Sequence, residues 1–244
     1  AGPGVVVTGT IITGQAVASV LQACGDDDTR VVVVRRRDVL HLTRAIVEGG
    51  RAGGDPPIAC VPTSWSPIPD DPRPVVVGVD DPASSSDLLG AALEIAQVHN
   101  APLRIVHAWR LPDKYQRMVG DRIVGQWTEQ LRASLDELVR RCGVAADSHV
   151  ATCIVVVPGV AADVLAVEAT RAQFLVIRRN HEAGGTEHVG RTTRYALHEC
   201  PCPVILTPRT RTLDEDAGLP LRSGPGVTGP YGPVGSSPRG RVWP

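Results

Sequence analysis

Arginine and glycine residues are concentrated where one apolar run of the sequence ends. Arg178 and Arg179 close the run that begins at Phe174, and Gly190 and Arg191 open a later helical pattern. Guanidinium groups form charge-assisted hydrogen bonds with phosphate oxygens, and the free N–H groups at the start of a helix attract the same anions. The spacing therefore indicates an anion site that suits a phosphorylated ligand.

A carboxylate follows a second apolar run, where it could bind another part of such a ligand. Asp80 comes directly after Val79, and Val106 ends the next apolar run along the chain. In an open parallel sheet, ligands bind outside the carboxyl ends of the strands. We therefore expect Val79, Asp80 and Val106 to border one crevice together with Thr192 and Thr193, with Asp80 accepting a hydrogen bond from a ribose hydroxyl.

Strand and helix patterns alternate through the segment that holds these residues. Val75–Val79 is a β-branched run interrupted only by Gly78, typical of a strand that is covered on both faces, and Ser84–Ser86 offer N-caps for the helix that follows. The alternation predicts an α/β fold with an open parallel five-stranded sheet and helices on both faces. The expected strands are 75–79, 103–106, 153–157, 174–177 and 203–207, and the later helices are 121–142, 161–171 and 190–199.

Part of this pattern occurs twice in the chain. TRVVVVRRRD at 29–38 resembles AQFLVIRRNH at 172–181, and PPIACVP at 56–62 resembles CPVILTP at 202–208. Such self-similarity indicates that one structural unit has been used twice. Because apolar edge strands generally need cover, we expect the last strands of the two copies to pair, either within the chain or between chains.

The two copies differ in length. The strand–helix–strand pattern of 73–109 has no equivalent before the first copy, which is therefore expected to be a half-module of the same type. The predicted organisation is a truncated module at 1–62, a proline-rich linker at 63–72, a complete module at 73–208 and a disordered Gly/Pro-rich tail at 209–244.

Composition excludes several classes of site. The chain has 25 basic and 26 acidic side chains and a net charge of −1, which argues against a general nucleic-acid or membrane-surface binder. The six cysteines lack zinc-type spacing, so we expect no metal and interpret Cys200 and Cys202 as small apolar residues beside a buried strand. No apolar run approaches the roughly 18 residues of a membrane span, and no basic residue precedes Arg30, so a cytoplasmic location is expected.

Several segments together resemble the universal stress protein family. They are VVVGVDDPASSSDLLGAALEIA, APLRIVHAW, VVPGVAADVLAVEA and the closing VGRTTRYALHECPCPVILTP. The resemblance spans 73–208 and, in truncated form, about 5–62. It implies a Rossmann-like fold of the adenine nucleotide alpha hydrolase type, in a tandem arrangement whose first module is incomplete.

The resemblance also implies ATP binding in one branch of the family. That branch has a loop of the form Gly, two residues, Gly, nine residues, Gly, then Ser or Thr, which falls on Ile177, Asn180, Gly190 and Arg191 of this chain. One glycine of the three is present and the hydroxyl is missing. Asn tolerates left-handed backbone, whereas the β-branched Ile177 stands where the backbone should approach the nucleotide.

Two functions stay open at this stage. The first is a non-catalytic stress-response module that works by binding and assembly, with a degenerate ATP-binding loop and arginines held in salt bridges. The second is an ATP-binding regulator that uses the crevice between Asp80 and Gly190. An enzyme is not expected, because Ser84–Ser86 lack a Gly-x-Ser-x-Gly elbow and no catalytic base or metal-binding carboxylate pair accompanies them.

Overall fold

The computed structural model describes residues 31–36, 56–110, 121–143, 149–179 and 190–208. These residues all belong to the first of two compact units, Ala1–Thr210, and the second unit is Arg211–Pro244. The expected disordered tail, the first helix of the half-module and the loop at 180–189, including Asn180, lie outside the described residues.

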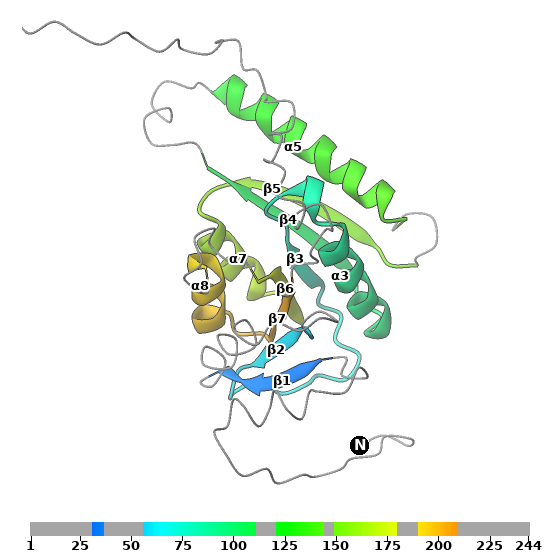
Figure 1. The fold of residues 1–244 in the computed structure, drawn as a ribbon, viewed down its shortest axis with the longest axis vertical. Coiled ribbons are helices and arrows are strands. Elements are labelled where there is room, and N and C mark those ends of the chain that lie inside the picture. Colours follow the sequence, from blue (N-terminus) through cyan, green and yellow to red (C-terminus); the bar gives the residue numbers. More distant parts are fainter. Residues whose placement is uncertain (1–30, 37–55, 111–120, 144–148, 180–189, 209–244) are drawn as a thin grey trace, which may run out of the picture. The chain divides into compact units, whose positions relative to one another are not determined.

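One seven-stranded sheet organises the described part of the chain (Figure 1). Its spatial order is β1-β2-β7-β6-β3-β4-β5. The strands are β1 (Val32–Arg35), β2 (Ile58–Val61), β3 (Val75–Gly78), β4 (Leu103–Trp109), β5 (Thr152–Pro158), β6 (Phe174–Arg178) and β7 (Val204–Thr207). The five strands from β3 to β7 are mutually parallel, which confirms the predicted five-stranded sheet.

Helices cover both faces of this sheet, as predicted. They are α3 (Ser86–Val98), α5 (Asp121–Arg141), α7 (Ala161–Ala169) and α8 (Arg191–Glu199). Figure 1 shows α7 and α8 on one side of the sheet and α3 on the other. Leu165 of α7 and Leu197 of α8 belong to one apolar cluster, whereas Leu89 of α3 and Leu135 of α5 belong to a second. The sheet therefore separates two cores.

The turn between β3 and α3 is built differently from the predicted serine cap. Ser85 occupies the N-cap position of α3 without a side-chain cap bond, and its hydroxyl donates instead to the Asp81 carbonyl at 2.6 Å. The Asp81 carboxylate accepts from the Ala83 N–H at 3.0 Å and from the Ser84 hydroxyl at 2.9 Å. Asp81 thus caps the short 3₁₀ helix η2 (Pro82–Ser84), because a carboxylate directly before the turn reaches these donors first.

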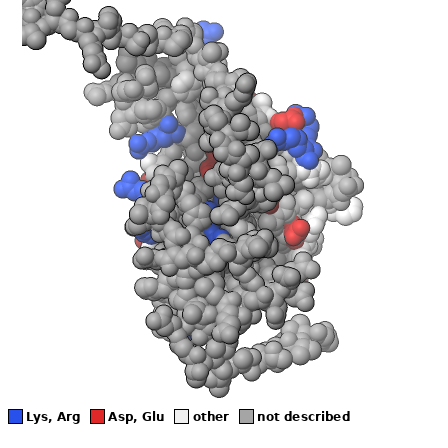
Figure 2. Space-filling view, viewed as in Figure 1, with Lys and Arg blue, Asp and Glu red and all other residues white. Residues whose placement is uncertain are grey.

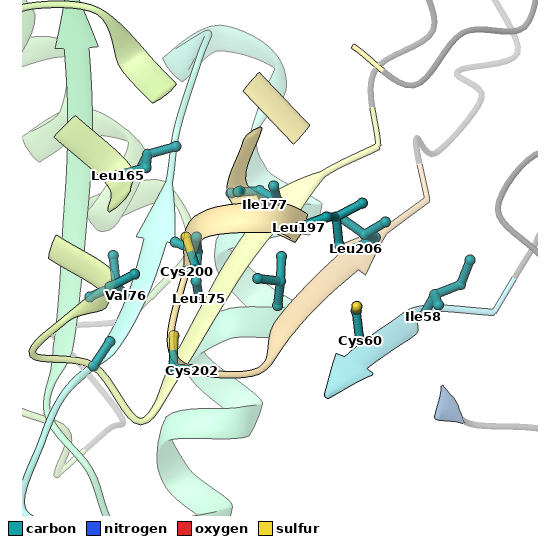
Figure 3. Packing of buried hydrophobic residues seen from close by; sticks show 14 of the residues in the cluster. Ile58, Cys60, Val76, Leu165, Leu175, Ile177, Leu197, Cys200, Cys202 and Leu206 are labelled. Carbon is teal, nitrogen blue, oxygen red and sulfur yellow. The ribbon is translucent and has the colours of Figure 1, made fainter. Parts of the chain in front are cut away.

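An antiparallel contact joins the two strand groups at β2 and β7. Ala59 lies opposite Ile205 at its centre, flanked by the pairs Ile58–Leu206 and Cys60–Val204. We call this contact the seam. Figure 3 shows Ile58 and Cys60 on β2 beside Leu206, with Leu197, Cys200 and Cys202 in the same apolar cluster. The expected pairing of the two terminal strands occurs within the chain, and pairing between chains stays a prediction.

The strand pairs on the two sides of the seam have the same register. Val32 is opposite Ile58 in the β1–β2 pair, and Leu175 is opposite Val204 in the β6–β7 pair. Segments 29–38 and 56–62 resemble 172–181 and 202–208 in the sequence, so residues at matching places in the similar segments are paired alike. β1 is therefore the positional counterpart of β6.

The thiols around the seam are buried and neutral. Burial raises the pKa of Cys60 to about 11, that of Cys200 to about 12 and that of Cys202 to about 11, from an ordinary value of 9.0. Cys60 and Cys200 are fully inaccessible to solvent. The interpretation of Cys200 and Cys202 as apolar core residues agrees with their place in this cluster.

Arg36 connects the first segment to the carboxyl end of α8. Its guanidinium donates to the His198 carbonyl at 3.0 Å and also to the Cys200 carbonyl. The last carbonyls of a helix have no partner within the helix and carry the negative end of its dipole, so an arginine at this position satisfies them.

The segment between β2 and β3 packs along the amino ends of the strands. Trp65 lies 6.2 Å from Phe174, measured between ring centroids, and the Gln173 amide donates to the Arg73 carbonyl at 2.8 Å. Arg73 also forms a salt bridge with Asp71, and this hydrogen-bonded pairing lowers the pKa of Asp71. No helix in the described residues is both long and apolar enough to cross a membrane.

Candidate functional site

A cavity of about 170 Å³ opens at the carboxyl ends of the strands, where the winding of the sheet reverses at β3. It lies on the α7 and α8 side of the sheet. Its lining consists of Gly78, Val79, Asp80, Val106, Ala108, Ala161, Leu165, Ile177, Arg178, Thr192 and Thr193. Six residues predicted for the site line this one cavity: Val79, Asp80, Val106, Arg178, Thr192 and Thr193.

The floor of the cavity is closely packed. A Cβ added at Gly78 would lie 3.0 Å from Leu165 Cδ2 and 3.1 Å from Ile177 Cγ2. The side chains of Leu165 and Ile177 therefore already occupy the space above the end of β3. Small-molecule sites commonly have volumes of roughly 300–1,000 Å³, so the described part of this cavity holds a fragment of a nucleotide rather than all of it.

The polar rim is formed by Asp80 and the start of α8. Asp80 is exposed, and its Oδ1 accepts from the Asp81 N–H at 2.9 Å. Gly190 is the N-cap of α8 and has no side chain to bond the first helical N–H groups. The N–H groups of Arg191, Thr192 and Thr193 are the first in the helix and therefore take no partner from an earlier helical turn. Asp80, Thr192 and Thr193 line the same cavity.

Arg178, which the sequence predicts to bind a phosphate, makes intramolecular bonds in the structure. Its Nη2 donates to the Ser84 carbonyl at 2.6 Å and forms a salt bridge of 2.5 Å with Asp87 Oδ1. Both partners lie at the start of α3, on the opposite face of the sheet from α7 and α8. The side chain of Arg178 is 6% exposed, so it is committed to this intramolecular bond. Consecutive residues of a strand point to opposite faces, so the guanidinium of Arg178 extends away from the face on which Ile177 lies.

The other two arginines of the predicted site lie in different surroundings. Arg179 is buried, and its backbone N–H donates to the Thr207 carbonyl at 2.9 Å, continuing the ladder between β6 and β7. Arg191 is exposed at the first position of α8. Arg191 is thus the arginine of this group that stands beside the free helix start.

Groups that could perform acid–base or nucleophilic chemistry near the cavity are held in structural bonds. The Nδ1 atom of His107 lies 2.9 Å from the Val79 carbonyl, and the ring is buried on the α3 side of the sheet. Ser84 and Ser85 donate to Asp81. Among the described residues, no three His, Cys, Asp or Glu side chains gather as metal ligands.

Sequence reasoning missed four residues of the lining: Gly78, Ala108, Ala161 and Leu165. Gly78 precedes Val79 in a strand, and alternation of side chains alone would have placed it on the cavity face. Leu165 lies on the inward side of a helix with buried Ala162 and Ala169, at the spacing of an amphipathic stripe. The strand alternation and the apolar helix stripe are both visible in the sequence. Because they indicate packing, they gave no reason to predict a functional role for Gly78 or Leu165.

Charge on the visible surface is mixed. Figure 2 shows basic and acidic side chains of the described residues in small separate groups on this face.

The fold has counterparts in known proteins. The family model described as the universal stress protein family matches residues 72–208, which is more than half of the chain. The chain belongs to the universal stress protein family. No curated protein sequence matches the chain significantly.

Three solved structures share the fold. A functionally unknown protein from Pseudomonas aeruginosa PAO1 aligns at 14% identity with a TM-score of 0.54, covering 81% of this chain and 69% of that one. A candidate universal stress protein from Pseudomonas aeruginosa UCBPP-PA14 aligns at 15% identity and 0.54, covering 79% and 66%. A universal stress protein from Archaeoglobus fulgidus DSM 4304 aligns at 14% and 0.51, covering 79% and 65%. The chain thus spans about two thirds of these structures, and at this identity they show the fold alone.

Proposed function

We propose that this chain is a non-catalytic binding and assembly protein of the universal stress type, with a cytoplasmic location and a degenerate nucleotide cleft. The observation that carries the proposal is the state of the cleft. Its floor is filled by Ile177 and Leu165, and Arg178, the cation that follows, is bound to Asp87 on the far side of the sheet. Among the described residues, the cleft keeps its position in the fold, its floor is filled, and the guanidinium of Arg178 is bonded elsewhere.

We also propose that the chain is a tandem protein whose first module is incomplete. The support comes from the seam. Ala59 and Ile205 hold the same place in the two similar segments, and they lie opposite each other. On either side of this pair, Ile58 lies opposite Leu206 and Cys60 lies opposite Val204, so Ile58 and Cys60 each face the counterpart of the other. This is the register that a local two-fold relation between two copies requires. The seam would then serve as a module-to-module contact made inside one chain.

The seam accounts for the assembly role. β2 lies between β1 and β7, and β7 lies between β2 and β6, so each terminal strand has a neighbour on both edges. Self-association through these strands would therefore be satisfied within the chain. Association between chains would have to use other edges of the sheet.

One observation favours the alternative of an ATP-binding regulator. Asp80, the start of α8 and the two threonines Thr192 and Thr193 converge on one cavity, as a nucleotide site on this fold would need. In this alternative Asp80 accepts from a ribose hydroxyl, and the helix start receives phosphate oxygens.

Equilibrium dialysis against millimolar ATP separates the two functions. We expect no stoichiometric uptake by the wild-type chain, because the cleft is partly filled. An Asp80→Ala variant should behave identically, as should Asp136→Ala, a matched change of an exposed carboxylate on α5. Uptake that is lost in Asp80→Ala and retained in Asp136→Ala would contradict the nucleotide-free proposal and establish the regulator.

A further inference from the structure

The last residue of β3 has no side chain, and the space above it is filled from β6 and α7. Gly78 lies opposite Ile177 in the parallel pairing of β3 with β6. A Cβ added at Gly78 would lie 3.1 Å from Ile177 Cγ2 and 3.0 Å from Leu165 Cδ2. A glycine in a strand often marks a place where a ligand or another backbone approaches closely. Here two aliphatic side chains occupy that place.

Ile177 is held more firmly than Leu165. Its strand is paired on both edges, with Gly78 opposite Ile177 on one side and Leu206 opposite it on the other. Ile177 is 4% exposed and belongs to the apolar cluster on the α7 and α8 side of the sheet. A β-branched side chain is stiff at χ1, whereas the leucine on α7 has no branch at Cβ. Ile177 is therefore a fixed obstruction that cannot turn aside when a ligand approaches.

The polar residues around the cavity do not share this obstruction. Asp80, Thr192 and Thr193 line the same cavity as Ile177. Carboxylate and hydroxyl groups can bind the hydroxyls of a sugar, and a helix start such as that of α8 suits a phosphate. Groups that suit a nucleotide are thus present at the rim, and the floor is where the cavity is filled.

The size of the cavity indicates how much one side chain matters. The cavity measures about 170 Å³. Small-molecule sites begin at roughly 300 Å³. Truncation of one large aliphatic side chain in a core opens on the order of 100 to 150 Å³. Removal of the Ile177 side chain beyond Cβ would therefore bring the described part of the cavity close to the lower limit for such a site.

We propose that Ile177 determines the ligand specificity of this cleft: its side chain excludes nucleotides, and a chain with alanine at this position binds them. The inference rests on the proposed function, which gives the chain a degenerate nucleotide cleft, and it adds the residue that makes the cleft degenerate. In the variant, the sugar of the nucleotide takes the space above Gly78, at the rim that carries Asp80.

Equilibrium dialysis of full-length variants against ATP and AMP at millimolar concentration tests the proposal. We expect Ile177→Ala to take up about one equivalent of nucleotide, with an affinity at least about tenfold above the detection limit at which the wild-type chain shows none. Ile177→Val should behave like the wild-type chain, because valine retains a methyl group at the position of the Cγ2 atom that lies above Gly78.

Ile205→Ala is the matched control for a cavity made elsewhere in the core. Ile205 lies on the neighbouring strand β7, is 9% exposed and belongs to the cluster on the α3 side of the sheet. It should lower the urea midpoint about as much as Ile177→Ala does, without any gain in nucleotide uptake. Circular dichroism checks that both variants are folded, and trimethylamine N-oxide, which favours the folded state, is added equally to all samples if Ile177→Ala is partly unfolded.

A second change in the Ile177→Ala chain locates the bound nucleotide. Adding Asp80→Ala should weaken its binding by about tenfold, whereas adding Asp136→Ala, at an exposed carboxylate on α5, should leave it unchanged. Amide hydrogen exchange at 191–195 should slow when ATP is added to Ile177→Ala and stay unchanged in the wild-type chain.

Three results would overturn the inference. They are an absence of uptake by folded Ile177→Ala, equal uptake by Ile205→Ala, and uptake by Ile177→Ala that is insensitive to Asp80→Ala. The first of these leaves the nucleotide-free function in place, because the wild-type chain would still bind no nucleotide. Uptake by the wild-type chain that Asp80→Ala abolishes would contradict the nucleotide-free function itself, and with it the role of Ile177.

Discussion

The strands β1 and β6 occupy equivalent places on the two sides of the seam, yet their surroundings differ. They share register, an apolar sequence and a closing arginine. Val176 is fully buried and Arg178 has an acidic partner, while Val33 is 64% exposed and Arg35 is exposed. A repeated sequence thus specifies the neighbour on one edge of a strand. The burial of its faces depends on helices that come from elsewhere in the chain.

Introducing a charge into both strands tests this difference most strongly. Val176→Asp should destabilise the fold by about 4 kcal/mol or more, because a charge would be placed in a closed core. Val33→Asp should cost less than about 1 kcal/mol, since its side chain already contacts solvent. Urea unfolding followed by circular dichroism measures both. If Val176→Asp cannot be purified folded, Val176→Thr and Val33→Thr are the near-isosteric pair, and equal losses for them would contradict the comparison.

Removing the acidic partner of Arg178 should have the next largest effect. Asp87→Ala removes the carboxylate partner of the nearly buried Arg178 guanidinium and leaves it the Ser84 carbonyl. We expect the free energy of unfolding to fall by about 2 kcal/mol, a moderate loss because Asp87 is 34% exposed. Arg35→Ala in the counterpart strand should change stability by less than about 0.5 kcal/mol.

The double variant Asp87→Ala with Arg178→Met provides the control for that experiment. Removing both charges should recover part of the lost unfolding free energy, because the uncompensated buried charge is no longer present. A double variant as unstable as Asp87→Ala would show that the salt bridge is not the reason for the loss.

The smallest expected effect concerns the thiols at the seam. Burial raises the pKa of Cys60, Cys200 and Cys202 above the ordinary value of 9.0. A group whose pKa is higher in the folded state contributes stability below its unfolded pKa and loses that contribution as the pH rises toward the folded value. Between pH 7 and pH 9 the three thiols together should lower the free energy of unfolding by about 1 kcal/mol. Urea midpoints should fall accordingly, and Cys60→Ala or Cys200→Ala should reduce the fall, whereas Cys153→Ala, at an exposed thiol, should not.

Local patterns were sufficient to predict the layers of the fold. The β-branched run at 75–79, the amphipathic helix at 121–142 and the alternation of elements after them correspond to β3, α5 and the parallel sheet. The repeat indicated which strands should pair, and β2 and β7 do pair. These features depend on periodicity and self-similarity, which the sequence displays directly.

The chemistry of the site was harder to predict. Arg178 was predicted to bind a ligand, and its side chain forms a salt bridge with Asp87. The serines after Asp81 were predicted to cap the next helix, and the hydroxyls of Ser84 and Ser85 donate to Asp81. The salt bridge between Arg178 and Asp87 joins residues that are far apart in the sequence. The apolar run that precedes Arg178 does not indicate which face of the sheet its side chain will lie on. Which side of a fully buried strand a residue faces follows from the assembled sheet, since both sides are apolar.

The hydrogen bonds from Arg36 to the last carbonyls of α8 connect the segment that contains β1 to the helix whose other end lies at the cleft. α8 begins at the rim that Asp80 shares and ends under the Arg36 guanidinium, so one rod links the two places. Shortening the chain to begin after residue 62 would therefore release the far end of that rod. The start of α8, at the entrance of the cleft, would then be held less firmly, although no described residue of the deleted part lines the cleft.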